Sequence, residues 1–262
     1  MPDVPHSAEH SLLIEIGGGR ATVTMNRPAM HNRLDGVDLE TLGRALDEID
    51  ANPEVRVLVL TGTGKSFCSG YDLGSLAAGA SGAAPVSDRF SFATLVDKVE
   101  AMRVPTIAAF NGGVYGGGTD LGLACDLRIG VAATRIMMPA GQIGLHYYAS
   151  GIRRYVTRMT PGAAKRLFML GETLDAQEML RIGYLDEIVP DLAALRARVD
   201  VVAGLIANAP SAEVMQSMKR AINRIADANM DPTEADAASA ASRRSPIVAQ
   251  AVAARLAARK KK

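Results

Sequence analysis

The sequence predicts an α/β core followed by a helical C-terminal region, and two patterns carry this prediction. Over the first part of the chain, short apolar and β-branched runs alternate with segments whose apolar residues recur at helical spacing. From about residue 160 onward, only the helical periodicity remains. Alternation of this kind is typical of helices packed against a sheet. We place the core in residues 1–200 and the helical region in residues 201–262.

The N-terminal part of the predicted core begins with a β-hairpin. Residues 12–16 and 21–26 flank the sequence Gly-Gly-Gly-Arg, which suits a turn between antiparallel strands. A helix is expected over residues 38–49, where apolar residues recur every three or four positions before an Asn-Pro pair ends the pattern. The mostly apolar run at residues 55–60 then predicts a buried strand.

The middle of the chain continues the alternation. Residues 76–87 are rich in Ala, Gly and Ser and are expected to form a loop. A helix over residues 90–102 and a strand over 106–110 follow, and then a turn with three consecutive glycines leads into another helix. Residues 127–131 predict a further strand. In the C-terminal region one apolar helix face, typical of core or of a subunit contact, is formed by Met215, Met218, Ile222 and Ile225.

Composition and charge narrow the class of protein. Of the 262 residues, 48% are hydrophobic and 22% are charged, as in ordinary globular proteins. A net charge of +1 gives no broad field toward nucleic acid or an anionic membrane. The two cysteines, Cys68 and Cys125, lack metal-ligand spacing and suit a reducing compartment. Without a signal-peptide pattern or an apolar run of ~20 residues, we expect a cytoplasmic protein with no nucleic-acid, membrane or metal partner.

Two glycine-containing turns are the first candidate for a site. Each follows an apolar strand, one at Ser69-Gly70-Tyr71 and the other at Gly116-Gly117-Gly118. Two backbone N–H groups that converge on one oxygen form an oxyanion hole. The second group would lie at the start of a helix, where the helix dipole adds to the attraction. The alternative is a tight turn without a ligand, which three glycines would also serve.

A nucleotide-binding motif is the second candidate, and the spacing argues against it. The segment TGTGKS contains Gly-Lys-Ser, but a P-loop needs a further glycine five positions before the glycine of that triplet. Val59 occupies that position, inside the predicted strand. The glycine-rich segments also lack the spacing of a dinucleotide-binding turn.

Three segments together resemble one known superfamily. VPTIAAFNGGVYGGGTDLGLACDLRI, residues 104–129, is similar to the central motif of the crotonase (enoyl-CoA hydratase/isomerase) superfamily. GTGKSFCSGYDL resembles the first oxyanion turn of that family, and MNRPAMHNRLD resembles its N-terminal segment. The order and spacing hold over roughly residues 12–225. This combination is specific for the superfamily and much less specific for the reaction.

The resemblance implies a fold, a ligand and an assembly. Members of the family bind acyl-CoA thioesters and hold the thioester oxygen as an enolate, here with the N–H groups of Tyr71 and Gly117. CoA is part of the substrate, so no separate cofactor is expected. The core would be a spiral of repeated ββα units, and the C-terminal helices would form a homotrimer or a homohexamer. By position, the substrate-binding residues would be Ser69, Tyr71, Asp72, Leu73, Gly74, Gly116 and Gly117.

The family's two catalytic acids are only partly present. Hydratases of the family usually place two glutamates around one water, because protonating Cα and delivering hydroxide to Cβ each need a proton-exchanging group. The first position falls on Asp120, which is shorter by one methylene. Alignment of Ile143-Gly144 with the family's Leu-Gly places Ala140 at the second, so one carboxylate is missing. An acid in the first turn of a helix is also favoured by the dipole without any catalysis.

Two residues after this glycine are further candidates for catalysis. Tyr147 matches a tyrosine of family members that lack the second glutamate, decarboxylases among them, although its ring could simply pack. His146 could replace the missing proton donor or could be a hydrogen-bonded structural group. Asp126, Arg153 and Arg154 are interpreted as structural pairs or solvated charges.

The resemblance therefore predicts an enzyme that adds water to 2-enoyl-CoA, with Asp120 as its acid/base and Tyr71, Gly117, Tyr147 and His146 as the other catalytic residues. An enoyl-CoA isomerase or an acyl-CoA decarboxylase of the same superfamily is an alternative. A non-catalytic acyl-CoA-binding protein that kept both turns is another.

Overall fold

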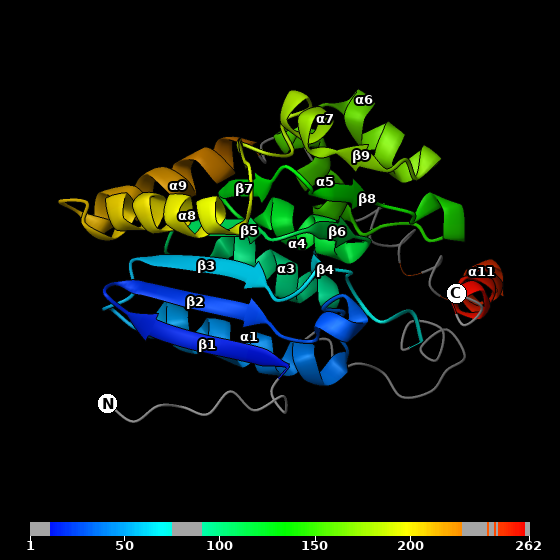
Figure 1. The fold of residues 1–262 in the computed structure, drawn as a ribbon, viewed down its shortest axis with the longest axis horizontal. Coiled ribbons are helices and arrows are strands. Elements are labelled where there is room, and N and C mark those ends of the chain that lie inside the picture. The colour runs from blue at the N-terminus through cyan, green and yellow to red at the C-terminus, as the bar shows by residue number, and fades with distance from the viewer. Residues whose placement is uncertain (1–10, 75–90, 227–239, 241–243, 245, 260–262) are drawn as a thin grey trace.

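Two sheets form the centre of the molecule, as a computed structural model of the chain shows (Figure 1). The structure describes residues 11–74, 91–226, 240, 244 and 246–259. The larger sheet contains, in spatial order, β1 (Leu12–Gly17), β2 (Arg20–Met25), β3 (Val57–Gly62), β5 (Thr106–Phe110), β7 (Leu127–Val131) and β10 (Glu187–Val189). The smaller sheet contains β4 (Ser66–Cys68), β6 (Gly113–Tyr115), β8 (Arg135–Met137) and β9 (Leu174–Asp175). The mixed α/β fold is thus confirmed.

The strands alternate between the two sheets in a repeating order. β3, β5 and β7 are parallel neighbours in the larger sheet, and each is followed by a short strand, β4, β6 or β8, in the smaller sheet. A helix comes next in each case, namely α3 (Phe92–Ala101), α4 (Gly117–Ala124) or α5 (Ala149–Arg158). Three successive strand–strand–helix units therefore wind in one direction, as the expected spiral of ββα units requires.

The remaining helices cover the sheets and extend the C-terminal region. They are α1 (Gly36–Ala51), α6 (Pro161–Lys165), α7 (Ala176–Arg181), α8 (Leu192–Ala207), α9 (Ala212–Ala226) and α11 (Pro246–Arg259), with the 3₁₀ turns η1 (Pro28–Met30) and η3 (Gly141–Ile143) and the π-helical segment η4 (Arg166–Leu170). Within the described ranges, no helix combines the length and apolar character needed to cross a membrane.

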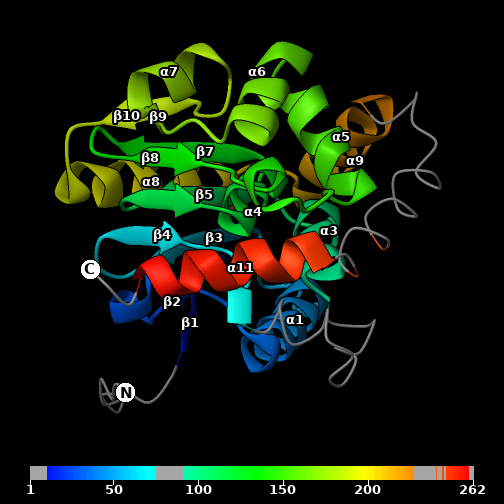
Figure 2. The same ribbon diagram turned by 90° about the vertical axis from the view of Figure 1, so that its right-hand side faces the viewer.

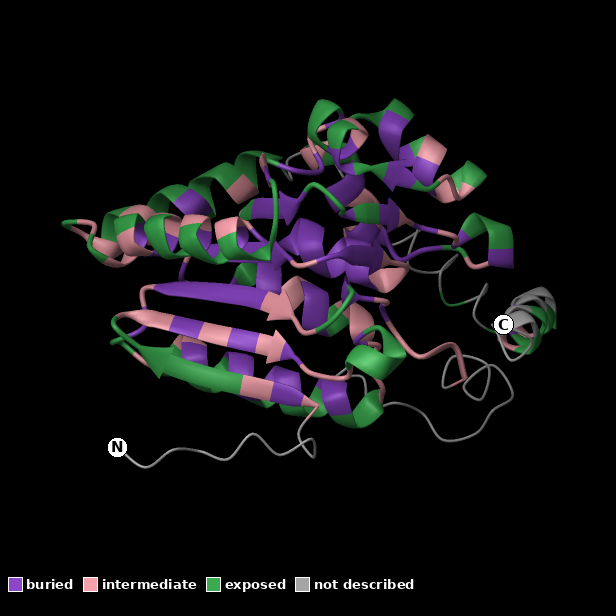
Figure 3. Cartoon of the chain, viewed as in Figure 1, coloured by how far each residue is buried: buried purple, intermediate pink, exposed green. Residues whose placement is uncertain are grey.

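The strand β3 shows why the core has two layers of side chains. Leu58 and Leu60 point into the main core, whereas Val57 and Val59 pack on the opposite face with side chains of α8. Successive side chains of a strand point to opposite faces, so a strand covered on both sides needs an uninterrupted apolar run. Figure 3 shows β3 buried along most of its length, as the apolar run predicted.

The long elements agree with the sequence predictions, with small shifts at their ends. The expectation of helices alone after about residue 160 is wrong, because the short strands β9 and β10 lie there, one in each sheet. The hairpin forms as β1 and β2, and the strands predicted at 106–110 and 127–131 have those bounds. The helices predicted over 38–49 and 90–102 are α1 and α3. The loop predicted at residues 76–87 lies outside the described residues.

The C-terminal helices leave an apolar surface. Met215 of α9 is partly buried against the α8 layer, whereas Met218, Ile222 and Ile225 of the same predicted face are 50–77% exposed. Lys219 anchors α9, since its Nζ donates to the carbonyl of Val104 at 3.0 Å and pairs with Asp126 at 2.8 Å. The helix α8 runs through residue 200. The division of the chain into a core and a helical region at that residue remains a prediction.

The last helix lies beside the segment that follows β8. In Figure 2, α11 is the red helix that crosses the front of the molecule. Val252 of α11 is buried against Ile143, with Leu73 and Leu145 packed around them. The helix α11 is thereby brought next to the turn that follows β4.

Candidate active site

The two glycine-containing turns are in direct backbone contact. β4 and β6 are parallel neighbours, so their carboxyl ends lie side by side, with Gly70 after β4 and Gly117 after β6. A Cβ added to Gly70 would lie 2.9 Å from the Cα of Gly117 and 2.9 Å from the backbone N of Gly118, and closer still to the N of Gly117. Gly70 also has a φ of +79°, which L side chains rarely adopt. Only glycine allows the two turns to approach this closely.

Hydrogen bonds with neighbouring backbone fix the direction of the N–H groups in both turns. The carbonyl of Gly70 accepts from Leu34 N–H at 2.9 Å, and Asp72 N–H donates to the carbonyl of Leu34 at 2.8 Å. The intervening N–H of Tyr71 therefore points away from Leu34, since alternate N–H groups of an extended chain point to opposite sides. Gly117 is the first residue of α4, and its N–H has no acceptor within the helix.

Two residues of the segment MNRPAMHNRLD, Asn32 and Arg33, hold the first turn in place. Asn32 is buried in a left-handed conformation, and its Nδ2 donates to the carbonyls of Thr63 at 2.9 Å and Ser66 at 2.7 Å. Arg33 pairs with Asp72 at 2.8 Å. The sequence analysis did not assign these roles to Asn32 and Arg33, although an asparagine is among the residues that tolerate this backbone conformation best.

The substrate-binding residues predicted from the resemblance lie on these two turns and their flanks. Ser69, Asp72, Leu73 and Gly74 are partly buried around Tyr71, and Gly116 precedes α4 with its N–H on the carbonyl of Met137 at 2.9 Å. Beneath them, the Sγ of Cys68 accepts from Gly70 N–H at 3.2 Å. Burial raises the pKa of the Cys68 thiol to about 12, which the Gly70 N–H offsets only in part. This thiol is protonated at neutral pH and fills space under the turn.

The carboxylate of Asp120 is fully buried and surrounded by four donors. Arg154 donates from Nε to Oδ1 at 2.8 Å and from Nη2 to Oδ2 at 3.1 Å. The hydroxyl of Tyr147 donates to Oδ2 at 3.1 Å, and the hydroxyl of Tyr148 donates to the same oxygen. Asp120 thus lies in an ion pair that joins α4 to α5, with two tyrosine hydroxyls on one of its oxygens.

The two tyrosines are neutral hydrogen-bond donors. Their rings stack with centroids 4.4 Å apart. Burial, and then the negative charge of Asp120, raise the pKa of Tyr147 and of Tyr148 well above the ordinary value. The structure therefore brings Asp120 and Tyr147 together, as the sequence analysis suggested, and adds Tyr148 to them.

The other two predicted positions are Ala140 and His146. Ala140 is buried in the main core at the start of η3. His146 is exposed, and its Nδ1 lies 2.8 Å from the carbonyl oxygen of Tyr147. Their catalytic significance remains a prediction.

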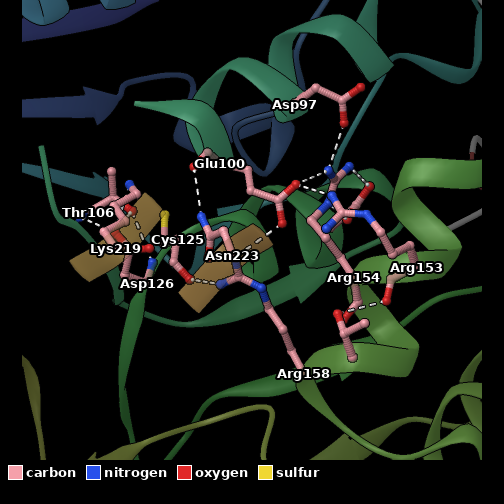
Figure 4. Close-up of polar contacts among 12 residues, drawn as sticks. Asp97, Glu100, Thr106, Cys125, Asp126, Arg153, Arg154, Arg158, Lys219 and Asn223 are labelled. Carbon is pink, nitrogen blue, oxygen red and sulfur yellow. Dashed lines mark hydrogen bonds and ion pairs between the residues drawn. The ribbon is translucent and has the colours of Figure 1, made fainter. Parts of the chain in front are cut away.

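The sequence analysis interpreted Arg154 as part of a structural pair or as a solvated charge, and the structure confirms the structural pair. The side chain is fully buried, which the sequence analysis did not foresee. Its Nη1 donates to Asp97 at 2.7 Å and to Glu100 at 3.0 Å, as Figure 4 shows. Glu100 also accepts from Arg153 and Arg158, and although its burial alone would raise its pKa, Arg154 and these other arginines lower it. The sequence signal that could have indicated this burial was the spacing of Tyr147, Gly151 and Arg154, which is that of residues on one face of a helix.

Within the described residues, no group of three or more His, Cys, Asp or Glu side chains could hold a metal ion.

Comparisons with known proteins agree with this geometry. Residues 15–245 match the model of the enoyl-CoA hydratase/isomerase family, and the chain belongs to that family. It is 30% identical over 227 residues to the short-chain-enoyl-CoA hydratase of Clostridium acetobutylicum, covering 85% of this chain and 84% of that one. It is 32% identical over 182 residues to the carnitinyl-CoA dehydratase of Proteus mirabilis, covering 68% of each.

The fold is similar to solved structures of the same family. An enoyl-CoA hydratase/isomerase from Mycobacterium paratuberculosis superimposes with a TM-score of 0.83 at 23% identity, over 93% of this chain and 97% of that one. Membership of the family makes the chain an enzyme of the enoyl-CoA hydratase/isomerase class, with the particular reaction left to the proposal below.

The backbone contact at Gly70 gives a first prediction. Gly70→Ala forces the two turns apart, so turnover of acyl-CoA substrate should fall by about 10²–10³-fold, the usual effect of losing one oxyanion donor. Steady-state kinetics on folded protein measure this loss. Gly204→Ala is the matched control, since a Cβ there would meet nothing within 4 Å. Equal turnover by the two variants would contradict the assignment.

Proposed function

We propose that the protein is a hydratase-type acyl-CoA enzyme that adds water to 2-enoyl-CoA. The thioester oxygen would accept hydrogen bonds from the N–H groups of Tyr71 and Gly117, which stabilise the negative charge as the enolate forms. The observation that carries the proposal is the contact between the Gly70 turn and the start of α4. The hydratase and dehydratase names of the relatives support it.

The proton chemistry is proposed to pass through Asp120 and its tyrosines. Addition of water breaks one O–H bond, places hydroxide on Cβ and places a proton on Cα. Because four donors surround the Asp120 carboxylate, a proton from the water would reach it through the hydroxyl of Tyr147 or Tyr148. The tyrosine would accept one proton from the water as it passes its own to Asp120, and one proton would return along the same path to Cα of the enolate, so that the site is regenerated. The exposed His146 is a further candidate proton donor at the surface.

A second candidate function rests on the same four donors. Both oxygens of the Asp120 carboxylate already accept hydrogen bonds, and decarboxylation needs the oxyanion hole but no base. Loss of CO₂ from a malonyl-type CoA ester would leave the same enolate between Tyr71 and Gly117, to be protonated at Cα. Isomerisation of a 3-enoyl-CoA requires a proton to leave one carbon and return to another, so it depends on Asp120 as hydration does.

Turnover of a panel of CoA esters separates these functions. We expect crotonyl-CoA to gain the mass of one water, at a lower rate than with dedicated hydratases because Ala140 supplies no second carboxylate. Mass spectrometry measures the products from crotonyl-, 3-hydroxybutyryl- and malonyl-type CoA, and the ultraviolet absorbance of the conjugated enoyl thioester measures isomerisation of 3-enoyl-CoA, which leaves the mass unchanged. Loss of CO₂ alone would favour the second candidate, and binding without turnover of any ester would contradict both.

The role of Asp120 gives a further prediction. Asp120→Asn keeps the size of the side chain and removes the proton acceptor, so turnover should fall by about 10²–10⁴-fold while acyl-CoA binding persists. Kinetics and calorimetric binding on folded protein measure the two effects.

The matched control for this prediction is Asp126→Asn. It removes a carboxylate from another ion pair, that with Lys219 at 2.8 Å. Breaking an ion pair lowers the free energy of unfolding in both variants, and a thermal melt measures that loss. Turnover by Asp120→Asn within about threefold of the parent would rule out a proton-transfer role.

The assembly is proposed to be a homotrimer or a homohexamer, with the apolar surface of α8 and α9 at a subunit contact. Its large exposed side chains are Val201, Leu205, Val214, Met218, Ile222 and Ile225, 50–77% exposed in the single chain. A cytoplasmic location is proposed as well, supported by two free, buried cysteines.

Light scattering tests the assembly. We expect a mass of three or six chains for the parent, and a smaller species for Ile222→Glu combined with Ile225→Glu, because burying two carboxylates without partners is unfavourable. Val37→Glu, at an exposed apolar position of α1, is the control that should leave the mass unchanged. A monomeric parent at micromolar concentration would contradict the proposal.

A further inference from the structure

We infer that Arg154 is a positioning residue that fixes the Asp120 carboxylate and, through it, the hydroxyl of Tyr148. The inference deepens the proposed function and rests on it, because Asp120 and its tyrosines are the proton-exchanging groups of that proposal. Neither the family match nor the names of the relatives assign a role to this arginine.

The fork of the guanidinium determines the plane of the carboxylate. Nε donates to one oxygen of Asp120 at 2.8 Å and Nη2 donates to the other at 3.1 Å. Two parallel hydrogen bonds of this kind fix an orientation as well as a distance, which a single point charge cannot do. Both side chains are fully buried, so water does not compete for these bonds.

The same guanidinium is held independently at its other end. Nη1 donates to Asp97 at 2.7 Å and to Glu100 at 3.0 Å, both on α3. Glu100 in turn pairs with Arg153 and with Arg158, so its carboxylate is also fixed (Figure 4). Arg154 is therefore a rigid bridge from α3 to the carboxylate on α4, and it does not simply follow the position of Asp120.

Tyr148 contacts both members of the pair. Its hydroxyl donates to Oδ2 of Asp120, and Nη2 of Arg154 lies 3.4 Å from the same hydroxyl oxygen. The guanidinium carbon lies 5.8 Å from the centre of the Tyr148 ring. A change in the direction of the Arg154 guanidinium would therefore move Asp120, the acceptor of the Tyr148 hydroxyl. It would also change the contact between the guanidinium and the Tyr148 ring.

Gly151 provides the space for this arrangement. It lies on α5 one turn before Arg154, and a Cβ there would meet Oδ2 of Asp120 at 2.9 Å and Cδ1 of Tyr147 at 2.7 Å. A larger residue at this position would push the carboxylate or the Tyr147 ring aside. The side of α5 that faces Asp120 thus combines a long cationic donor with a residue that has no side chain.

The kinetic test compares Arg154→Lys with Arg153→Lys. Lysine keeps the positive charge and loses the fork, so Arg154→Lys should lower kcat by about a hundredfold, the effect of a misplacement near 1 Å. KM should change by less than about threefold, because the side chain of Arg154 is fully buried and pairs with carboxylates of the protein. Arg153→Lys is the matched control, since Arg153 pairs with Glu100. All kcat values are divided by the number of binding-competent sites from calorimetry, which removes the effect of misfolded protein.

A spectroscopic test is independent of the reaction. The chain has no tryptophan, so its emission comes from its six tyrosines. A tyrosine hydroxyl that donates to a carboxylate has quenched emission, and Arg154→Lys should therefore change the emission intensity. The change should disappear when Tyr148→Phe is present in both proteins, which assigns it to Tyr148. The emission change of Arg153→Lys should be smaller than that of Arg154→Lys.

The outcomes distinguish this inference from the proposed function. A Tyr148-dependent emission change together with the loss in kcat supports it. A kcat per competent site within about threefold of the parent, or an emission change that persists with Tyr148→Phe, overturns it. If the parent turned over no CoA ester, the proposed function would be contradicted. The emission measurement alone would then test whether Arg154 positions the Tyr148 hydroxyl. If Arg154→Lys did not fold, Gly151→Ala would take its place in both tests, because its Cβ displaces the same carboxylate.

Discussion

The site depends on the close approach of two backbones, that of the turn after β4 and that of the first residues of α4. The approach follows from the winding of the chain. Each ββα unit places its second strand in the smaller sheet, so the turns after β4 and β6 emerge side by side. Glycine at positions 70 and 118 then lets the two turns touch, because a Cβ at Gly70 would meet the backbone of Gly117 and a Cβ at Gly118 would meet the carbonyl of Cys68. A side chain at either position would separate the two turns.

Behind this contact, buried charges connect the helices of successive units. Asp97 and Glu100 come from α3, Asp120 from α4 and Arg154 from α5. Removing one partner of a buried pair typically costs about 3–5 kcal/mol, since the other charge is left without compensation. The network therefore fixes how the three helices sit relative to one another, and so where α4 presents its first N–H to the Gly70 turn. Stability and site geometry depend on the same contacts here.

The sequence could predict the strands and helices whose apolar residues form a regular pattern. It could not predict the contacts made between successive ββα units. The strands at 106–110 and 127–131 are apolar runs, and they were found with the observed bounds. β4, β6 and β8 have three residues each, too few to show alternation, although they carry the turns of the site. The family motif located Asp120, but its donors come from residues 27 to 34 positions later. Two adjacent arginines look alike in a sequence, and only the direction of α5 decides which one is buried.

The carboxylate of Asp120 belongs to a larger arrangement of buried charges. Among the described side chains around Glu100, three carboxylates, those of Asp97, Glu100 and Asp120, face three guanidinium groups, those of Arg153, Arg154 and Arg158. A further carboxylate beside Asp120 would have no cation left to balance it, and a buried, unpaired charge is strongly unfavourable. Neutral donors avoid this cost, and Tyr147 and Tyr148 are such donors. Under the proposed function, this environment would favour proton exchange through hydroxyl groups around a single paired carboxylate.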